Sequence, residues 1–407
     1  MTHDYDVIIA GAGLAGNCLG LALRAGGLSV AIVEAATRRE LDASPLGERA
    51  LALSAGTVRL LEDLGIWELA AQRAAPIRRI HVSDRGHFAK TRLDADEQGV
   101  EALGYVILGR DLERQAAEQA ERAGVEVLYG ARLVGLMSSA EAAHVCLKRQ
   151  DESLNVTAAL VVGADGGQST VRRLLDIPQH TVDYGQTALV TAVHTGLPHH
   201  DTAFERFTPF GPLALLPLAP KEAAVIWTRS HEQARALMAG GETDFLAALQ
   251  DCFGYRLGAL RLSAPRRAFP LSLIRAGAMF SGRAVIVGNA AHQLHPVAGQ
   301  GFNLGMRDAA ALADLLRARR RQGGDLGAPD LLRRYQNLRQ ADHDQTIGFT
   351  DGLVRIFSTD WGPAAAARNF GLAVLDHLPG ARRLLGRHAM GLARPLPNLG
   401  AESREGS

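Results

Sequence analysis

Cysteine is scarce in this sequence, which has three in 407 residues and no CxxC pair. Cys18, Cys146 and Cys252 stand far apart. An odd and sparse count of this kind excludes a small secreted fold held together by disulfides, and it fits structural thiols in a reducing cytosol.

Long apolar runs and an excess of one charge are also missing. No apolar stretch approaches the roughly 18 residues of a membrane span, and Met1–Tyr5 lacks the basic and apolar regions of an export signal. Lysine plus arginine number 44 and aspartate plus glutamate number 43, so the net charge gives no argument for binding nucleic acid or an anionic membrane. We therefore expect a cytoplasmic protein, peripheral to the inner membrane at most, without a nucleic-acid partner.

The usual hydrolytic constellations are absent as well. No Ser-His-Asp arrangement, metal-ligand cluster or pair of carboxylates stands out in the sequence. What is present is an ordinary globular balance of 47% apolar and 21% charged residues, enough for a large core. The length favours two or three domains, which large α/β enzymes often interleave.

The chain opens with a strand that runs into a glycine turn. Asp6–Ala10 is an apolar, β-branched run of the kind that forms a buried parallel strand. Gly11 permits a tight turn, Gly13 lets a pyrophosphate approach the backbone, and Gly16 lets the next helix pack closely on the strand. That helix would direct free N–H groups and its positive dipole end at the phosphates. The turn comprises Gly11, Ala12, Gly13, Leu14, Ala15 and Gly16.

A second strand, Ser29–Val33, ends at an acid, Glu34. A carboxylate about 20 residues after the glycines accepts both hydroxyls of an adenosine ribose. An acid there favours FAD or NAD and disfavours the 2′-phosphate of NADPH. Strand, helix, second strand and terminal acid together predict a dinucleotide-binding fold.

Two more glycine segments follow far along the chain. Leu160–Gly163 is typical of a buried strand, and it breaks at a turn that carries Asp165. Ala284–Val287 is a similar strand that leads into Gly288–His292, and His295–Gly305 then crosses a glycine-rich loop into a helix. Such a loop can place backbone N–H groups and a helix N-terminus where a bound ligand carries or develops negative charge.

In this order and at these separations, the three segments resemble those of the FAD-dependent aromatic hydroxylases, the single-component flavoprotein monooxygenases. The resemblance covers roughly residues 4–350. It implies an α/β fold, with a Rossmann-like FAD-binding domain interleaved with an antiparallel-sheet substrate domain, plus C-terminal helices. The expected boundaries are FAD-binding parts at 1–75, 101–182 and 269–330, a substrate-domain insertion at 76–100, the substrate domain at 183–268, and a C-terminal helical region at 331–400.

The resemblance also implies roles for individual residues. Asn289 stands where the family more commonly has aspartate, and we interpret this as tolerated variation because asparagine still donates and accepts hydrogen bonds. Pro296, Gly299 and Gly301 would form the surroundings of the flavin ring, with neither a protein nucleophile nor a metal. The implied cofactor-binding residues are Gly11, Ala12, Gly13, Leu14, Ala15, Gly16, Glu34, Arg49, Arg110, Asp165, Gly288, Asn289, Pro296, Gly299, Gln300, Gly301, Phe302 and Asn303.

The activity implied by the resemblance is hydroxylation of an electron-rich phenol through a flavin C4a-hydroperoxide. FAD would be the bound cofactor, NADH or NADPH the electron donor, and molecular oxygen the co-substrate. Within the family, Ser83–Gly86, Phe210–Leu213 and the Asn289 variant look most like the ubiquinone-biosynthesis hydroxylases, in particular the 2-polyprenyl-6-methoxyphenol hydroxylase branch. The site must exclude water, because the hydroperoxide otherwise collapses to hydrogen peroxide.

The substrate layer is expected between residues 187 and 230, where alternating patterns predict an antiparallel sheet, with Ile80–His87 adding strands to it. Leu213, Leu215 and Trp227 share one face at period two. We expect that face to line a tunnel for a hydrophobic substrate and to hold no buried arginine or lysine aimed at a carboxylate.

Three histidines, His87, His292 and His295, are candidates to assist deprotonation of a phenol, and the alternative for each is a structural role. Hydroxylation of another phenol, with a polar clamp for a carboxylate, stays open, as does a flavin dehydrogenase or reductase. A non-enzymatic FAD-binding subunit is disfavoured by the intact loop between His295 and Gly305. The basic helical segment after Arg333 could touch a membrane surface or another ubiquinone-biosynthesis protein, or simply pack on its own domain.

Overall fold

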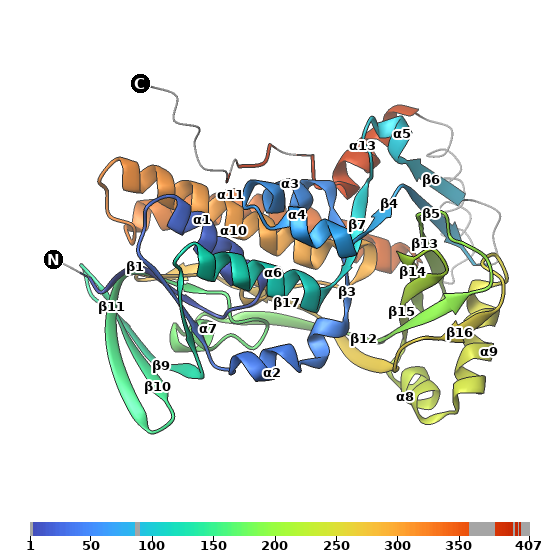
Figure 1. Ribbon diagram of the computed structural model, residues 1–407, viewed down its shortest axis with the longest axis horizontal. Coiled ribbons are helices and arrows are strands. Elements are labelled where there is room, and N and C mark those ends of the chain that lie inside the picture. Colours follow the sequence, from blue (N-terminus) through green and yellow to red (C-terminus); the bar gives the residue numbers. More distant parts are fainter. Residues whose placement is uncertain (1–2, 86–89, 358–378, 394, 398, 400–407) are drawn as a thin grey trace.

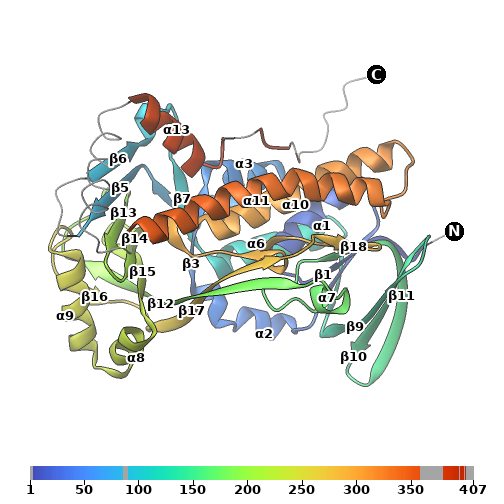
Figure 2. The same ribbon diagram turned by 180° about the vertical axis from the view of Figure 1, so that it is seen from behind.

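The computed structural model describes residues 3–85, 90–357, 379–393, 395–397 and 399. The candidate base His87 and the stretch 372–378 of the expected tail helices lie outside these residues. Two large sheets occupy opposite ends of the molecule and are joined by long strands, as Figures 1 and 2 show from the two sides.

The first sheet forms the nucleotide half and runs in the order β18-β19-β11-β1-β2-β8. Its central strands pair in parallel, and the apolar run in β1 is buried because helices cover the sheet. A hairpin of β9 and β10 extends β11 on one side. The bounds are β1 Tyr5–Ala10, β2 Val30–Glu34, β8 Glu126–Tyr129, β9 Ala131–Ser138, β10 Ala143–Arg149, β11 Glu152–Gly163, β18 Phe280–Ser281 and β19 Ala284–Ile286.

Helices α1, α6, α10 and α11 pack on one another over this sheet (Figure 1). Short helices and a three-stranded sheet, in the order β3-β7-β4, complete the nucleotide half. The α-helices are α1 Leu14–Ala25, α2 Arg38–Asp42, α3 Ala55–Asp63, α4 Trp67–Ala70, α6 Gly109–Arg122, α7 Thr170–Leu174, α10 Gln300–Arg321 and α11 Pro329–Phe357. The 3₁₀ turns are η1 Pro45–Glu48, η2 Ala71–Arg73, η3 Gly288–Ala290 and η4 Val297–Gly299, and the strands are β3 Ala50–Ser54, β4 Ala75–Ile77 and β7 Gly104–Leu108.

The second sheet has nine strands in the order β20-β17-β12-β15-β14-β13-β5-β6, with β16 on β12. β5 overlaps the segment Ile80–His87, which was expected to add strands to this sheet, and β6 follows it in the chain and pairs with it. The strands are β5 Arg79–Asp84, β6 Lys90–Asp94, β12 Gln179–Thr195, β13 Thr202–Thr208, β14 Gly211–Ala219, β15 Glu222–Ser230, β16 Leu260–Leu262, β17 Arg267–Ala276 and β20 His292–Gln293. The nearby helices are α5 Ala95–Gln98, α8 His231–Ala239, α9 Glu242–Phe253 and α13 Pro379–Ala389.

The two faces of the nine-stranded sheet have different surroundings. One face packs against α8 and α9 in a separate apolar core that includes Phe245 and Leu249. The other face lines a large cavity that continues into the nucleotide half. No helix within the described ranges is long and apolar enough to cross a membrane.

Candidate active site

The three glycine segments meet because their strands are neighbours. Ala10 at the end of β1 pairs with Gly163 at the end of β11, and Gly163 pairs with Ile286 at the end of β19. On the other side, Ala10 pairs with Val33, which precedes Glu34. Ligands of open parallel sheets bind at the carboxyl ends of the strands. Segments about 120 residues or more apart in the sequence therefore form one edge of the cavity.

The three glycines of the first turn have different steric surroundings, as their spacing predicts. Gly11 has φ of +104°, and a Cβ there would lie 2.5 Å from the carbonyl oxygen of Ala164. A Cβ on Gly16 would collide with the carbonyl oxygen of Gly11. A Cβ on Gly13 would meet nothing within 4 Å and would point into open space. Gly11 and Gly16 thus serve chain packing, whereas Gly13 leaves room beside the N-terminus of α1 for a ligand.

Glu34 is held by backbone amides at the edge of the cavity. Its Oε2 accepts the N–H of Ala12 and its Oε1 accepts the N–H of Ala36, both at 2.8 Å. The carboxylate is therefore fixed between the first turn and the end of β2. Each oxygen keeps acceptor capacity, so the group can still bind ribose hydroxyls.

Asp165 lines the cavity and carries one unsatisfied carboxylate oxygen. Its Oδ2 accepts the N–H of Thr170 at 2.6 Å and that of Val171 at 3.1 Å, at the start of α7. Its Oδ1 is buried and has no hydrogen-bond partner among the described residues. Because an unpaired buried oxygen costs free energy, a hydroxyl of a bound flavin nucleotide is a fitting donor.

Arg49 and Arg110 both line the cavity, and Arg110 is the second residue of α6. The guanidinium carbon of Arg49 is 5.8 Å from the ring centroid of Phe269. Burial lowers the pKa of Arg49, while the charge of Glu113 opposes this, and burial raises the pKa of Glu113. Both arginines supply positive charge to the cavity, and a guanidinium can bind phosphate or carbonyl oxygens with two hydrogen bonds.

The third segment supplies backbone at the start of a long helix. Gly288, Ala298 and Gly299 all have φ near +60°, so the chain turns sharply twice before α10 begins at Gln300. The residues of the first turn of α10, Gln300 to Asn303, line the cavity, and the N–H groups of a first turn have no acceptor within the helix. The side chain of Asn289 is exposed within the cavity.

Asn303 differs from the other implied cofactor residues because its side chain is fully used by the protein. Its Nδ2 donates to the carbonyls of Ala52 at 3.0 Å and Gly299 at 2.8 Å. Its Oδ1 accepts from the N–H of Ser54 at 2.9 Å and the hydroxyl of Thr57 at 2.7 Å. The side chain therefore clamps the loop to β3, and any contact with a flavin falls to its backbone.

The cavity measures about 1600 Å³. A pocket for one drug-sized ligand measures roughly 300–1,000 Å³, so this cavity has room for a dinucleotide and a second molecule. Every implied cofactor residue except Gly16 lines it, in agreement with the packing role of that glycine.

Comparison with known proteins agrees with this geometry. Residues 4–350 match the family described as FAD binding domain. The chain is 37% identical to the ubiquinone hydroxylase UbiL of Rhodospirillum rubrum over 392 residues, covering 95% of this chain and 89% of that protein. It is 32% identical to the 3-demethoxyubiquinol 3-hydroxylase of Escherichia coli, covering 95% and 98%. The structure matches the OxyS anhydrotetracycline hydroxylase of Streptomyces rimosus with a TM-score of 0.74 and 26% identity, over 97% of this chain and 77% of that one.

The chain belongs to the FAD-dependent aromatic hydroxylases. The predictions of an α/β flavoprotein fold, of FAD as cofactor and of a monooxygenase are thereby confirmed. The orphan oxygen of Asp165, the open space at Gly13 and the anchored Glu34 fit the nucleotide that this family binds.

The predicted substrate wall of this hydroxylase was wrong, because the residues next to the predicted ones along each strand line the cavity. Leu213, Leu215 and Trp227 do share a face, but that face packs against α8 and α9, where each of them is at most 1% exposed. The same face also holds a buried arginine, Arg229, stacked 4.4 Å from the Trp227 ring. Alternation shows which side chains share a face but not which face is covered by helices, and both faces here are apolar.

The cavity wall is formed by the intervening residues. Those on the central strands of the sheet are Ala188, Val190, Ala203, Glu205, Phe207, Ala214, Leu216 and Ile226. Seven of these eight side chains are apolar, so the hydrophobic wall exists on the face opposite to the predicted one.

Neither described histidine candidate is available as a base in this hydroxylase. His295 lines the cavity, but its Nδ1 accepts the N–H of Val297 at 3.2 Å and its Nε2 lies 3.3 Å from the amide oxygen of Gln186. Burial lowers the pKa of His295 to about 4, so it stays neutral at physiological pH. The ring is locked between two partners and serves to hold the loop.

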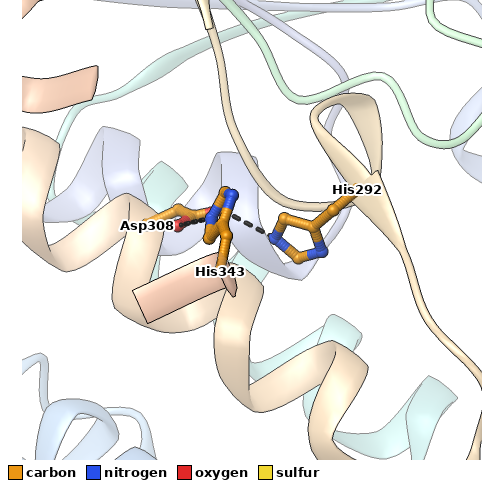
Figure 3. A group of neighbouring side chains, drawn as sticks. All are labelled: His292, Asp308 and His343. Atoms are coloured by element: carbon orange, nitrogen blue, oxygen red, sulfur yellow. Dashed lines mark hydrogen bonds and ion pairs between the residues drawn. The ribbon is translucent and has the colours of Figure 1, made fainter. Parts of the chain in front are cut away.

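His292 is not among the residues that line the cavity, and it lies in a buried cluster with Asp308 and His343 (Figure 3). Its Nε2 donates to Asp308 at 2.9 Å, and His343 donates to the other oxygen of Asp308 at 2.8 Å. Arg339 adds a salt bridge of 2.6 Å, and these partners hold the pKa of Asp308 well below its usual range against burial. A cation among these three groups would displace the hydrogen bonds and lie beside a guanidinium, so the cluster serves to join β20, α10 and α11.

Proposed function

We propose that this protein hydroxylates the aromatic ring of a polyprenylated phenol in ubiquinone biosynthesis, with electrons from NADH or NADPH. The observation that carries the proposal is the apolar extension of the cavity beyond the flavin-ring loop. The names of the relatives UbiL and 3-demethoxyubiquinol 3-hydroxylase agree with a substrate of this class.

The apolar extension leads from the loop at Pro296 toward the C-terminal helix α13. It passes the cavity face of the nine-stranded sheet and reaches Leu93, Leu103, Leu385 and Ala389. Each buried CH₂ contributes about 0.8 kcal/mol, so a few isoprene units in this channel suffice for micromolar affinity. A free carboxylated phenol would gain little from such a wall.

The distribution of charge in the cavity supports the same substrate. Its arginines all belong to the nucleotide half, namely Arg38, Arg49, Arg110, Arg114, Arg132 and Arg173. The described residues of the nine-stranded sheet that line the cavity include no arginine or lysine. The charged residue among them is an acid, Glu205. A substrate carboxylate would meet repulsion there in place of a clamp.

FAD, when bound, supplies the oxygen activation, and the protein positions the ring and keeps water away. The N-terminus of α10 and the loop at Pro296 would hold the flavin ring, while the apolar sheet face would dry the space above it. Gly13, Glu34 and Asp165 would fix the rest of the nucleotide.

Substrate delivery favours peripheral contact with a membrane at α13. Leu384 is 71% exposed, and Arg383 and Arg387 are exposed beside it, while Leu385 lies in the cavity wall. A helix with exposed basic and apolar groups next to the channel suits an anionic lipid surface. Flotation with anionic vesicles should recover the protein, and the double variant Arg383→Glu, Arg387→Glu should stay unbound.

The function is tested with the purified FAD-loaded protein. NADH or NADPH oxidation should accelerate with a short-prenyl methoxyphenol, KM should fall with each added isoprene unit, and mass spectrometry should detect the hydroxylated ring. Turnover of 4-hydroxybenzoate coupled to product, with none from the prenylated phenol, would overturn the proposal.

A further inference from the structure

Among the described residues of the nine-stranded sheet that line the cavity, Glu205 is the one with a charged side chain. It lies in a row of side chains that crosses five strands in register. The row consists of Thr91, Val82, Glu205, Ala214 and Ile226. All five line the cavity, so the carboxyl is surrounded by apolar neighbours and one hydroxyl.

The carboxyl of Glu205 makes no hydrogen bond or ion pair with any residue that the structure describes. Burial alone raises its pKa to about 7. Near neutral pH the group therefore exists in both its protonated and its ionised form. A carboxyl left without a partner in an apolar cavity is costly, and a ligand with a polar hydrogen would offset that cost.

Glu205 also lies close to the loop that would hold the flavin ring. Phe207, the next residue of β13 on the same face, packs with Val82 against Val297. Val297 directly follows Pro296. Two residues along a strand span about 7 Å, so a phenol ring between the loop and the sheet would reach the carboxyl.

The other titratable groups near Glu205 are accounted for. Asp84, on β5, is buried and has interactions of its own. His295 stays neutral, and the ring of Tyr184 packs edge-on against it at 5.3 Å. The nearby basic side chains lie around His81, on the opposite face of the sheet, where their charges help to lower its pKa. They are Lys90, Arg92, Arg206 and Arg256.

We propose that Glu205 binds the hydroxyl group of the phenol substrate and accepts its proton while the ring is hydroxylated. This inference rests on the proposed function, because it requires a phenol in the cavity. A base whose affinity for protons is matched to neutral pH is suited to this role. The negative charge that develops on the phenol oxygen makes the ring a better nucleophile.

The proton balance of this step is closed. The phenolic O–H bond breaks, its proton moves to a carboxylate oxygen of Glu205, and its electron pair stays on the phenol oxygen and is donated into the ring. One atom of the oxygen activated at FAD forms the new C–O bond as the O–O bond breaks. The hydroxylated ring carbon then loses its hydrogen as a proton, and this proton leaves with the second oxygen atom as water. The phenol oxygen then takes back the proton from Glu205, which returns to its ionised form.

The first test measures binding and needs no turnover. A short-prenyl methoxyphenol and its methyl ether, which lacks the phenolic hydrogen, are titrated into the FAD-loaded protein and followed by the flavin absorbance. At pH 8 the wild type should prefer the phenol by about tenfold or more, as expected for a hydrogen bond to a carboxylate. The preference should shrink as the pH falls through 7, where Glu205 becomes protonated.

Glu205→Gln keeps the size of the side chain but cannot ionise, so its preference for the phenol should not change between pH 6 and pH 8. Glu222→Gln, on β15 of the same sheet but outside the cavity lining, is the matched control and should behave as wild type. A wild-type preference that is independent of pH, or one that stays equally pH-dependent in Glu205→Gln, would overturn the inference.

The second test measures turnover. Glu205→Gln should lower kcat about tenfold or more with little change in KM, and its kcat should lose the rise through pH 7 that the wild type shows. Consumption of NADH or NADPH should continue and yield hydrogen peroxide. Wild-type kcat and pH profile in this variant would contradict the role of Glu205, whereas a wild type that binds the phenol and forms no product would contradict the proposed function alone.

Discussion

At its nucleotide end the cavity is walled by backbone turns, whereas at its substrate end it is walled by side chains from one face of a sheet. The turns at Gly11, Asp165 and Gly288 follow three adjacent strands and expose N–H groups and single polar atoms. The sheet face exposes mainly aliphatic groups around one carboxyl. One end therefore recognises a fixed polar ligand, and the other accepts an apolar one by shape and burial.

The largest expected effect is the loss of FAD when Gly13, which leaves room for a ligand, is replaced; Gly16, which is needed for chain packing, is the contrast. Gly13→Val should fold, because its side chain meets no protein atom within 4 Å, but should be isolated colourless since the side chain occupies the pyrophosphate site. Flavin absorbance and thermal unfolding measure the two properties.

Gly16→Val is the contrasting variant, and it should fail to fold because its side chain would collide with the backbone of Gly11. A fully loaded, yellow Gly13→Val protein would show that the phosphates bind elsewhere.

The next effect distinguishes the two faces of the nine-stranded sheet. Leu213→Ala, on the packed face, should lower the free energy of unfolding by about 2–5 kcal/mol, because it leaves a cavity against α9, and should leave KM nearly unchanged. Ala214→Phe, on the cavity face, should raise KM for the prenylated phenol with little loss of FAD. Denaturant titration and kinetics with both variants measure these effects. A raised KM in Leu213→Ala, with an unchanged KM in Ala214→Phe, would show that the face predicted from the sequence binds the substrate.

A pH-dependent effect is expected at Glu205. Its pKa is raised from 4.5 to about 7 on folding, so its stabilising contribution is fully present below pH 4.5 and is lost as the pH rises through 7. Glu205→Gln should therefore be more stable than wild type at pH 8, by on the order of 3 kcal/mol, and equal to it at pH 4.5. Thermal unfolding at the two pH values checks this. Equal stability at both would mean that the carboxyl is hydrated.

The smallest effect concerns the ribose contact. Glu34→Ala removes a charged acceptor worth about 1.5–3 kcal/mol, so FAD affinity should fall roughly tenfold or more. Glu34→Gln keeps one acceptor oxygen and should give an intermediate loss. Fluorescence titration of the apoprotein with FAD measures both, and unchanged affinity in the alanine variant would place the ribose at another residue.

The nucleotide end was predictable from the sequence because its signals are local. Each glycine turn follows directly on a buried strand, and the spacing of Gly11, Gly13 and Gly16 corresponds to three distinct steric needs that the structure shows. The role of Asn303 was less predictable, since three of its four hydrogen bonds join segments about 250 residues apart.

The substrate end was only half predictable because its decisive information is not local. Period two placed Leu213, Leu215 and Trp227 together correctly, but the position of α8 and α9 decides which face is free. Glu205 was missed for the same reason, since an acid between Phe204 and Arg206 is typical of a solvent-exposed strand position. The one signal in the sequence was that its period-two neighbours, Ala203 and Phe207, are apolar.

The central claim is that this cavity presents a prenylated phenol to oxygen activated at FAD. The most direct measurement is incorporation of isotope-labelled molecular oxygen into the ring of a short-prenyl methoxyphenol by the purified, FAD-loaded protein. The account predicts one labelled hydroxyl per product molecule, with yield that rises with tail length and falls in Ala214→Phe. Oxidation of NADH or NADPH without any label in the phenol, at saturating substrate, would contradict it.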